Sequence, residues 1–141
     1  MADDETPSLQ GSCLCGGVRY AARGPFTAVA RCHCVQCRKA SGAEFATNAS
    51  LTRDRFELLE GGDLVKAYLS SPGNQRHFCG RCGSPVFKTF DDQPEIVRLR
   101  LGLLDDPFTD PVQVRVFTDQ KLPMSVVPED GEPSFGTAPG R

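Results

Sequence analysis

Cys79-Gly80-Arg81-Cys82-Gly83, just past the middle of the chain, constrains the tertiary structure more than any other stretch. Two cysteines three residues apart, with a glycine after each, have the form of a zinc knuckle. The glycines allow a tight turn and let backbone N–H groups approach the sulfurs. A structural zinc ion takes four ligands, so this pair needs a partner pair elsewhere in the chain.

The other five cysteines form two further clusters, Cys13-x-Cys15 and Cys32-x-Cys34-x-x-Cys37, and no cysteine lies outside a cluster. In an extended chain, residues i and i+2 point to the same side, so the sulfurs of Cys13 and Cys15 face one centre, as do those of Cys32 and Cys34. Cys34 and Cys37 are spaced i and i+3, which brings them together on one helical turn. The spacing therefore indicates metal ligation, most simply by zinc.

Seven ligands divide most simply into a closed site of four and a site of three with one open position. The closed site is expected to hold the fold, and the open one can support chemistry. The predicted groups are Cys13, Cys15, Cys79 and Cys82 for structural zinc, and Cys32, Cys34 and Cys37 for catalytic zinc. Other pairings remain possible from spacing alone. The spacing is equally compatible with a fourth protein ligand at the second site. His33 fits that role poorly, because its side chain alternates away from Cys32 and Cys34.

A disulfide framework fits the chain less well than metal binding. An odd number of cysteines leaves one thiol over, and each cluster is too local for efficient cross-linking. The first seven residues are acidic and polar, unlike an export signal, and no apolar run is long enough to span a bilayer. We therefore expect a cytoplasmic protein whose thiols stay reduced.

The composition limits the number of domains and the class of partner. The length of 141 residues suits one domain, and 14 glycines with 11 prolines indicate many turns. The formal charge is −2 with neutral cysteines, and about −5 with seven thiolates and two zinc ions. This acidic balance argues against nucleic acid or an anionic membrane as the partner.

Short β-forming runs separated by turn residues predict a mainly antiparallel β domain. We expect a flexible leader over 1–10, a zinc-binding β domain over 11–127 and an extended tail over 128–141. A short helical turn is expected from Cys34 to Ala40, and a turn at 91–94. The predicted strands are 17–22, 27–34, 44–51, 56–59, 64–69, 85–90, 96–101 and 112–117.

The sequence resembles the glutathione-dependent formaldehyde-activating enzyme (GFA) and centromere protein V (CENP-V) family. All seven family cysteines are present in the family order, so the match is specific. It runs from residue 11 to about residue 125 and is carried by the stretches 11–20, 31–39 with 41–43, 78–87 and 101–107.

The resemblance implies an Mss4-like fold of small antiparallel sheets, and it implies the same division of the cysteines into structural and catalytic zinc sites. It also implies carbon–sulfur lyase activity, the reversible combination of glutathione with formaldehyde. Three thiolates make zinc a weak Lewis acid that favours soft sulfur, so we expect the glutathione thiol to be the ligand in the open position. The alternative is a non-catalytic zinc-binding module that recognises a protein or a small thiol, and the fourth ligand of the second zinc would separate the two.

Two positions depart from the family pattern. Arg115 stands where relatives often have histidine, and Met124 where they often have tryptophan, so these positions bear on the substrate rather than the fold. Several polar residues near the clusters could attract substrate or transfer protons, but each has an ordinary surface or turn role as its alternative. They are Gln36, Arg38, Lys39, Ser41, Glu44, His77 and Asp105.

Overall fold

The computed structural model describes residues 7–129 and 131–137, and strands make up most of it. One short α-helix, α1, and four single-turn 3-10 helices, η1 to η4, connect them. The strands are β1 (Ser8–Ser12), β2 (Arg19–Arg23), β3 (Thr27–Cys32), β4 (Ala46–Thr52), β5 (Phe56–Glu60), β6 (Val65–Ser71), β7 (Asn74–Cys79), β8 (Pro85–Phe90), β9 (Gln93–Arg100) and β10 (Val114–Val116). The helices are α1 (Val35–Ser41), η1 (Arg53–Arg55), η2 (Gly62–Leu64), η3 (Leu101–Leu103) and η4 (Thr118–Gln120).

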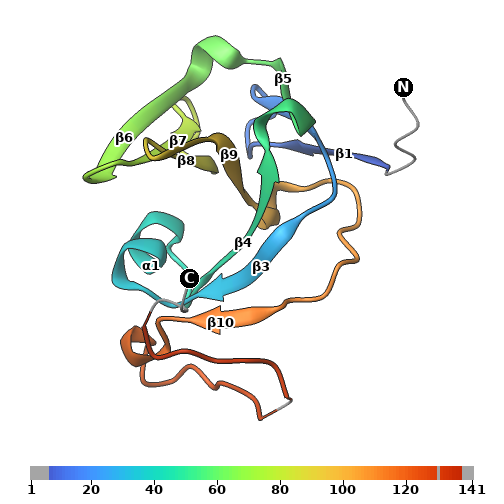
Figure 1. Ribbon diagram of the computed structural model, residues 1–141. Coiled ribbons are helices and arrows are strands. Elements are labelled where there is room, and N and C mark those ends of the chain that lie inside the picture. The colour runs from blue at the N-terminus through green and yellow to red at the C-terminus, as the bar shows by residue number, and fades with distance from the viewer. Residues whose placement is uncertain (1–6, 130, 138–141) are drawn as a thin grey trace.

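The strands form two sheets. The smaller is antiparallel with the order β1-β2-β5, and the larger has the order β10-β3-β4-β9-β8-β7-β6. Every pair in the larger sheet is antiparallel except β10 with β3, which run parallel. Figure 1 shows this sheet strongly curved, with α1 lying between its β3–β10 end and its β6–β8 end. The predicted mainly β fold is thus confirmed.

The main hydrophobic core lies between the two sheets. Val18, just before β2, and Tyr20, in β2, are fully buried. Val97 and Leu99 of β9 are fully buried in the same core. Tyr20 packs on Phe56 of β5 at 5.4 Å between ring centroids. Full burial of one such side chain contributes about 1.5–3 kcal/mol, so this core holds the smaller sheet against the larger.

Two local expectations differ from the structure. β1 begins at Ser8, inside the segment predicted as a flexible leader, because residues 8–12 pair with β2 from Ser8↔Arg23 to Ser12↔Arg19. The turn predicted at 91–94 was wrong in its second half, because β9 already begins at Gln93 and includes Pro94. Phe90 pairs with Gln93, so Pro94 stands at the start of a strand, where a missing N–H is tolerated.

The last described segment runs along β10. Ser134 pairs with Arg115 in a parallel bridge, and Glu132 lies 3.5 Å from the same guanidinium. Residues 1–6 of the predicted leader and residues 130 and 138–141 of the predicted tail lie outside the described residues. The division into leader, domain and tail stays a prediction.

Candidate metal centres

Four sulfurs from distant parts of the sequence meet at one point. Those of Cys13, Cys15, Cys79 and Cys82 all lie within 4.8 Å of one another. The Sγ atoms of Cys13 and Cys15 are 3.6 Å apart, and those of Cys15 and Cys79 are 3.9 Å apart. Four thiolates at about 2.3 Å from a tetrahedral zinc ion would be roughly 3.8 Å apart. The donor set and its spacing therefore fit zinc.

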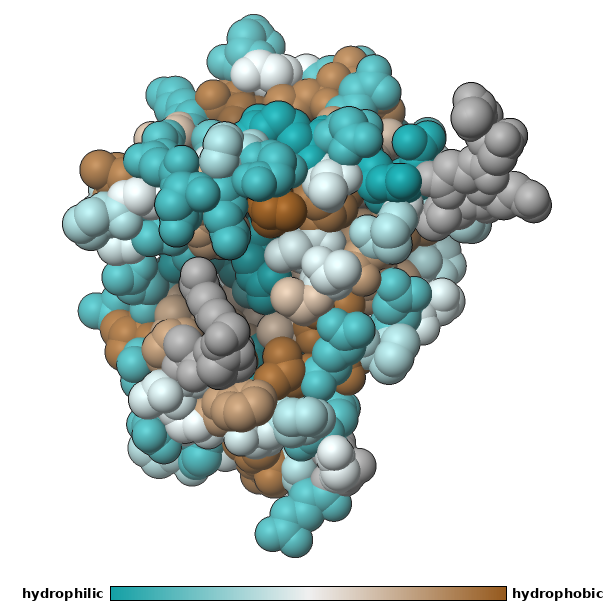
Figure 2. Space-filling view, in the orientation of Figure 1, coloured by the Kyte–Doolittle hydropathy of each residue, from teal (hydrophilic) through white to brown (hydrophobic). Residues whose placement is uncertain are grey.

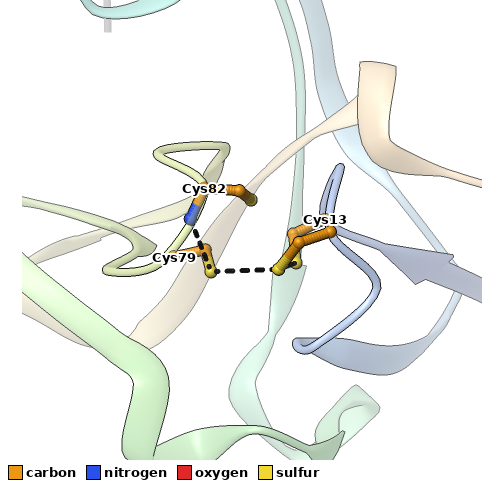
Figure 3. A group of neighbouring side chains, drawn as sticks. Cys13, Cys79 and Cys82 are labelled. Carbon is orange, nitrogen blue, oxygen red and sulfur yellow. Dashed lines mark hydrogen bonds between the residues drawn. The ribbon is translucent and has the colours of Figure 1, made fainter.

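This four-sulfur site joins the two sheets. Cys13 and Cys15 lie in the loop between β1 and β2, whereas Cys79 ends β7 and Cys82 lies in the turn that leads to β8. Figure 3 shows Cys13 facing Cys79 and Cys82 across the site. A hydrogen bond of 3.0 Å from the Leu14 N–H to Ser84 Oγ links the same two loops beside the sulfurs.

Hydrogen-bond donors point at the sulfurs of this site and favour their thiolate forms. The N–H of Val18 lies 3.2 Å from Cys13 Sγ. The backbone N–H of Gly17 and the side chain of Arg81 lower the pKa of Cys15. The side chain and backbone of Ser84 lower the pKa of Cys82 to about 5. Burial raises the pKa of Cys13, and the neighbouring thiols of the site raise it further, so a bound cation would offset the cost of ionising it.

The other three sulfurs come from one short segment. Cys32 ends β3, Cys34 is the N-cap of α1, and Cys37 lies in the helix, and their Sγ atoms lie within 4.8 Å of one another. The Cys34 sulfur accepts the N–H of Cys37 at 3.2 Å, so it caps the helix while pointing toward the site. At the other end, Gly42 adopts a left-handed φ of 69° and its N–H donates to the Arg38 carbonyl.

Within residues 7–129 and 131–137, no histidine or carboxylate joins this three-sulfur group. His33 turns away, as the alternation of the strand predicts. Its ring is buried against Phe45 at 5.2 Å between ring centroids, and its backbone N–H donates to the Val116 carbonyl. Three thiolates without a fourth protein ligand fit a zinc ion with an open coordination position.

Cations from the larger sheet surround the three-sulfur site. Arg76 Nη2 lies 4.0 Å from Cys37 Sγ. Hydrogen bonds from Cys32 and Cys34 lower the pKa of Cys37, and the charges of Arg100 and Arg76 lower it further. The same crowding by Cys34 and Cys37 raises the pKa of Cys32. Because three adjacent thiols cannot all ionise without a nearby cation, metal loading of this site would release protons.

A cavity of about 250 Å³ adjoins this site. Arg76 and Arg100 belong both to its lining and to the cations near Cys37. Figure 2 shows the surface hollowed beside α1, with a hydrophilic floor. A small ligand can therefore approach the three-sulfur site from this side.

The other polar candidates have structural partners. Ser41 Oγ donates to the Cys37 carbonyl at 2.7 Å, which is ordinary helix-end bonding. Glu44 accepts from Ser125 Oγ at 2.6 Å, and Asp105 accepts from Ser12 Oγ at 2.7 Å. His77 contacts Thr89 Oγ1 at 2.8 Å and lines the cavity without joining either sulfur group. Gln36, Arg38 and Lys39 lie on α1 but not in the cavity lining.

The two departures from the family pattern lie away from the cavity. Arg115 is buried in β10 beside Glu132, and Met124 is exposed on the surface. Neither lines the space next to Cys37. Arg115 therefore serves the packing of the C-terminal segment.

Sequence reasoning missed the cations of the site, which are Arg76, Lys88, Arg98 and Arg100. The pattern Val97-Arg98-Leu99-Arg100 alternates like a half-exposed strand, so its arginines read as solvent-facing. In the structure Arg100 is buried, and its Nη1 donates to Asn48 Oδ1 of the neighbouring strand β4. The strand order that brings the four together is not encoded locally.

Comparisons with known proteins agree with this geometry. Residues 8–120 match the model of the family described as "Glutathione-dependent formaldehyde-activating enzyme". A Halomonas elongata protein named "Putative glutathione-dependent formaldehyde-activating enzyme" is 37% identical over 112 residues, in an alignment that covers 73% of this chain and 69% of the relative. A crystal structure of a Rhodobacter sphaeroides protein has the same fold, with a TM-score of 0.57 and 22% identity over 90% of this chain and 99% of the other.

No helix in the described part of the chain has the length and apolar character that crossing a bilayer requires. The matched residues 8–120 include both sulfur groups and every strand of the two sheets. The chain therefore belongs to the glutathione-dependent formaldehyde-activating enzyme family.

Proposed function

We propose that this protein is a zinc-dependent carbon–sulfur lyase that forms and cleaves S-hydroxymethylglutathione. In the forming direction, the glutathione sulfur bonds to the formaldehyde carbon, the carbonyl π pair moves to oxygen, and the thiol proton ends on that oxygen. The observation that carries the proposal is the three-sulfur group with no fourth protein ligand among the described residues. Family membership and the name of the Halomonas relative support the choice of substrates.

The chain's own residues have two tasks in this proposal. Cys32, Cys34 and Cys37 hold the ion, and Arg76 and Arg100 keep the local potential positive, which favours an approaching thiol in its thiolate form. Zinc, when bound, supplies an open coordination position and lowers the pKa of a thiol. The four-sulfur site, none of whose cysteines lines the cavity, is proposed as the structural zinc site. We place the protein in the cytoplasm, where glutathione is abundant and thiols stay reduced.

Exchange spectroscopy with ¹³C-formaldehyde and glutathione tests this function. Zinc-loaded protein is expected to raise the exchange rate between free formaldehyde and its glutathione adduct in proportion to protein concentration. Cys37→Ser is expected to lower the catalysed rate at least tenfold and to reduce zinc from about two ions per chain to about one. The matched control is Ser70→Ala, a half-buried position on β6 outside both sulfur groups and the cavity lining.

An unchanged exchange rate with fully zinc-loaded wild-type protein would contradict the lyase proposal. That result would favour the alternative of a non-catalytic zinc-binding module. Retention of two zinc ions in Cys37→Ser would instead show that the three-sulfur group is assigned wrongly.

A further inference from the structure

Arg76 lacks partners for most of its hydrogen-bonding capacity. Its side chain is 9% exposed, and its Nε and Nη1 atoms have no hydrogen-bond partner among the described residues. The third nitrogen, Nη2, makes the long 4.0 Å contact with Cys37 Sγ. Arg100 differs, because its Nη1 donates to Asn48 Oδ1 at 2.5 Å. A buried guanidinium with two unbonded nitrogens is costly unless an anion completes it.

The charge around Arg76 is strongly one-sided. Arg76 pairs with Lys88 across β7 and β8, and Lys88 pairs with Arg98 across β8 and β9, so the three cations stand in one row. Arg100 follows two residues further along β9. None of the four forms an ion pair with a carboxylate in the described part of the chain. Three thiolates with one zinc ion carry a net charge of roughly −1, which leaves most of this positive charge uncompensated.

The cavity beside Arg76 has the shape and lining of a small-ligand site. Its volume is about 250 Å³, and the two arginines lie among rings and a proline. Tyr68 pairs with Arg76 across β6 and β7, and Phe78 lies two residues further along β7, so both rings lie beside Arg76 in the cavity lining. An apolar wall with a few convergent polar groups is typical of ligand pockets.

We propose that this cavity is a carboxylate-binding subsite in which Arg76 receives the carboxylate of the substrate and the aromatic wall receives its apolar portion. A carboxylate can accept from Nη1 and Nη2 together in bidentate geometry, since Nη1 has no partner among the described residues and Nη2 makes only the long contact with Cys37 Sγ. The inference rests on the proposed function in one respect, that the reacting thiol or aldehyde meets the three-sulfur site. Because Arg76 also lies next to Cys37, the subsite selects substrates whose carboxylate is a few bonds from the reacting atom.

A purely electrostatic role of Arg76 toward the thiolates is the competing explanation. It predicts that loss of Arg76 weakens zinc binding, since neighbouring charges tune metal ligands. It gives no reason for the wild-type protein to prefer a free acid to its amide. Zinc content and ligand preference therefore separate the two explanations.

The experiment uses the full zinc-loaded chain and two probes of equal shape, 3-phenylpropionate and 3-phenylpropionamide, in isothermal titration calorimetry. The wild type is expected to bind the acid at least tenfold more tightly than the amide. Arg76→Gln is expected to abolish this preference while keeping about two zinc ions. Equal binding of acid and amide by the wild type would overturn the inference, as would loss of zinc from the variant. Tighter binding of phenyl phosphate than of the acid would overturn the carboxylate assignment.

A second variant keeps the inference testable if Arg76→Gln does not fold. Ala40 is exposed on α1 and lines the cavity, so it tolerates a longer side chain. Ala40→Glu is expected to weaken binding of the acid at least threefold and to leave the amide unchanged, because its carboxylate competes for the same cations. Ala40→Gln is the uncharged control and is expected to retain the acid preference. Equal acid binding by the two variants would contradict the subsite.

Neither probe contains a thiol or an aldehyde, so their binding does not depend on lyase activity. Absence of adduct exchange together with an intact acid preference would reject the proposed function and retain the subsite. Catalysed exchange without an acid preference would reject the subsite and retain the proposed function.

Discussion

At the scale of single residues, the packing of one aromatic ring requires a glycine on the neighbouring strand. Gly11 lies directly opposite Tyr20 in the β1–β2 pair, and the tyrosine ring covers it. The side chain of Tyr20 is fully buried, and burial raises the pKa of its hydroxyl, with the charge of Asp105 adding to the effect. A glycine is needed here because the ring occupies the space of a β-carbon.

Gly11→Ala is expected to destabilise the protein by about 1–3 kcal/mol, because its Cβ would overlap Cζ and Oη of a ring that the core holds in place. Urea unfolding of the zinc-loaded protein measures the loss. Gly102→Ala is the matched control, since a Cβ there meets no atom within 4 Å, and we expect its stability to stay within about 0.5 kcal/mol of the wild type. Equal stability of the two variants would refute this account of the β1–β2 pair.

At the scale of elements, the three-sulfur site depends on a helix of only seven residues. Such a helix is marginal by itself, and both of its ends serve the site. Cys34 caps the first turn with its sulfur, and Gly42 ends the last turn in the left-handed conformation. The geometry of Cys37 is thus fixed by its two caps and by burial against the sheet.

Gly42→Ala is expected to cost about 1 kcal/mol, because a β-carbon disfavours the φ of 69° although nothing crowds the site. Gly42→Asn is expected to lose less, since asparagine tolerates this conformation better. Urea unfolding of both variants measures the order. Zinc affinity at the three-sulfur site should fall in the same order, and an alanine variant as stable as the wild type would contradict the capping role.

At the scale of the whole molecule, the two sulfur sites differ in what they connect. The four-sulfur site joins the β1–β2 loop to the β7–β8 turn, over about 65 residues of sequence and between two sheets. The three-sulfur site uses residues 32–37 only. A metal at the first site closes a long loop, whereas a metal at the second orders a local segment.

Loss of the four-sulfur site is therefore expected to affect stability far more than loss of the three-sulfur site. Cys82→Ser is expected to lower the free energy of unfolding by roughly 3 kcal/mol or more, because metal binding contributes directly to folding. Cys37→Ser should keep the fold and lose about one zinc ion. Thermal unfolding monitored by circular dichroism, with zinc analysis of the same samples, compares the variants. Collapse of the fold in Cys37→Ser with a stable Cys82→Ser would reverse the two assignments.

Much of the fold could be predicted from local sequence. β8 was predicted with its full bounds, 85–90, because a turn signal flanks it on both sides and its residues favour strands. β1 was missed because its residues Ser8 to Ser12 contain little apolar surface, and its pairing with β2 is decided by register rather than propensity. The family was recognisable because metal ligation requires cysteines at fixed local spacings.

The sequence by itself determined the sulfur chemistry, since two or three ligands on one turn or one strand edge follow from backbone geometry alone. Only the tertiary structure decided what surrounds that chemistry. Arg76, Lys88 and Arg98 come from three strands and become neighbours through the order β7-β8-β9 and its register. That order also turns Arg76 toward Cys37 and into the cavity. Strand order depends on long-range packing, which no short stretch of sequence encodes, so the metal ligands were visible in the sequence and the ligand-binding cations were not.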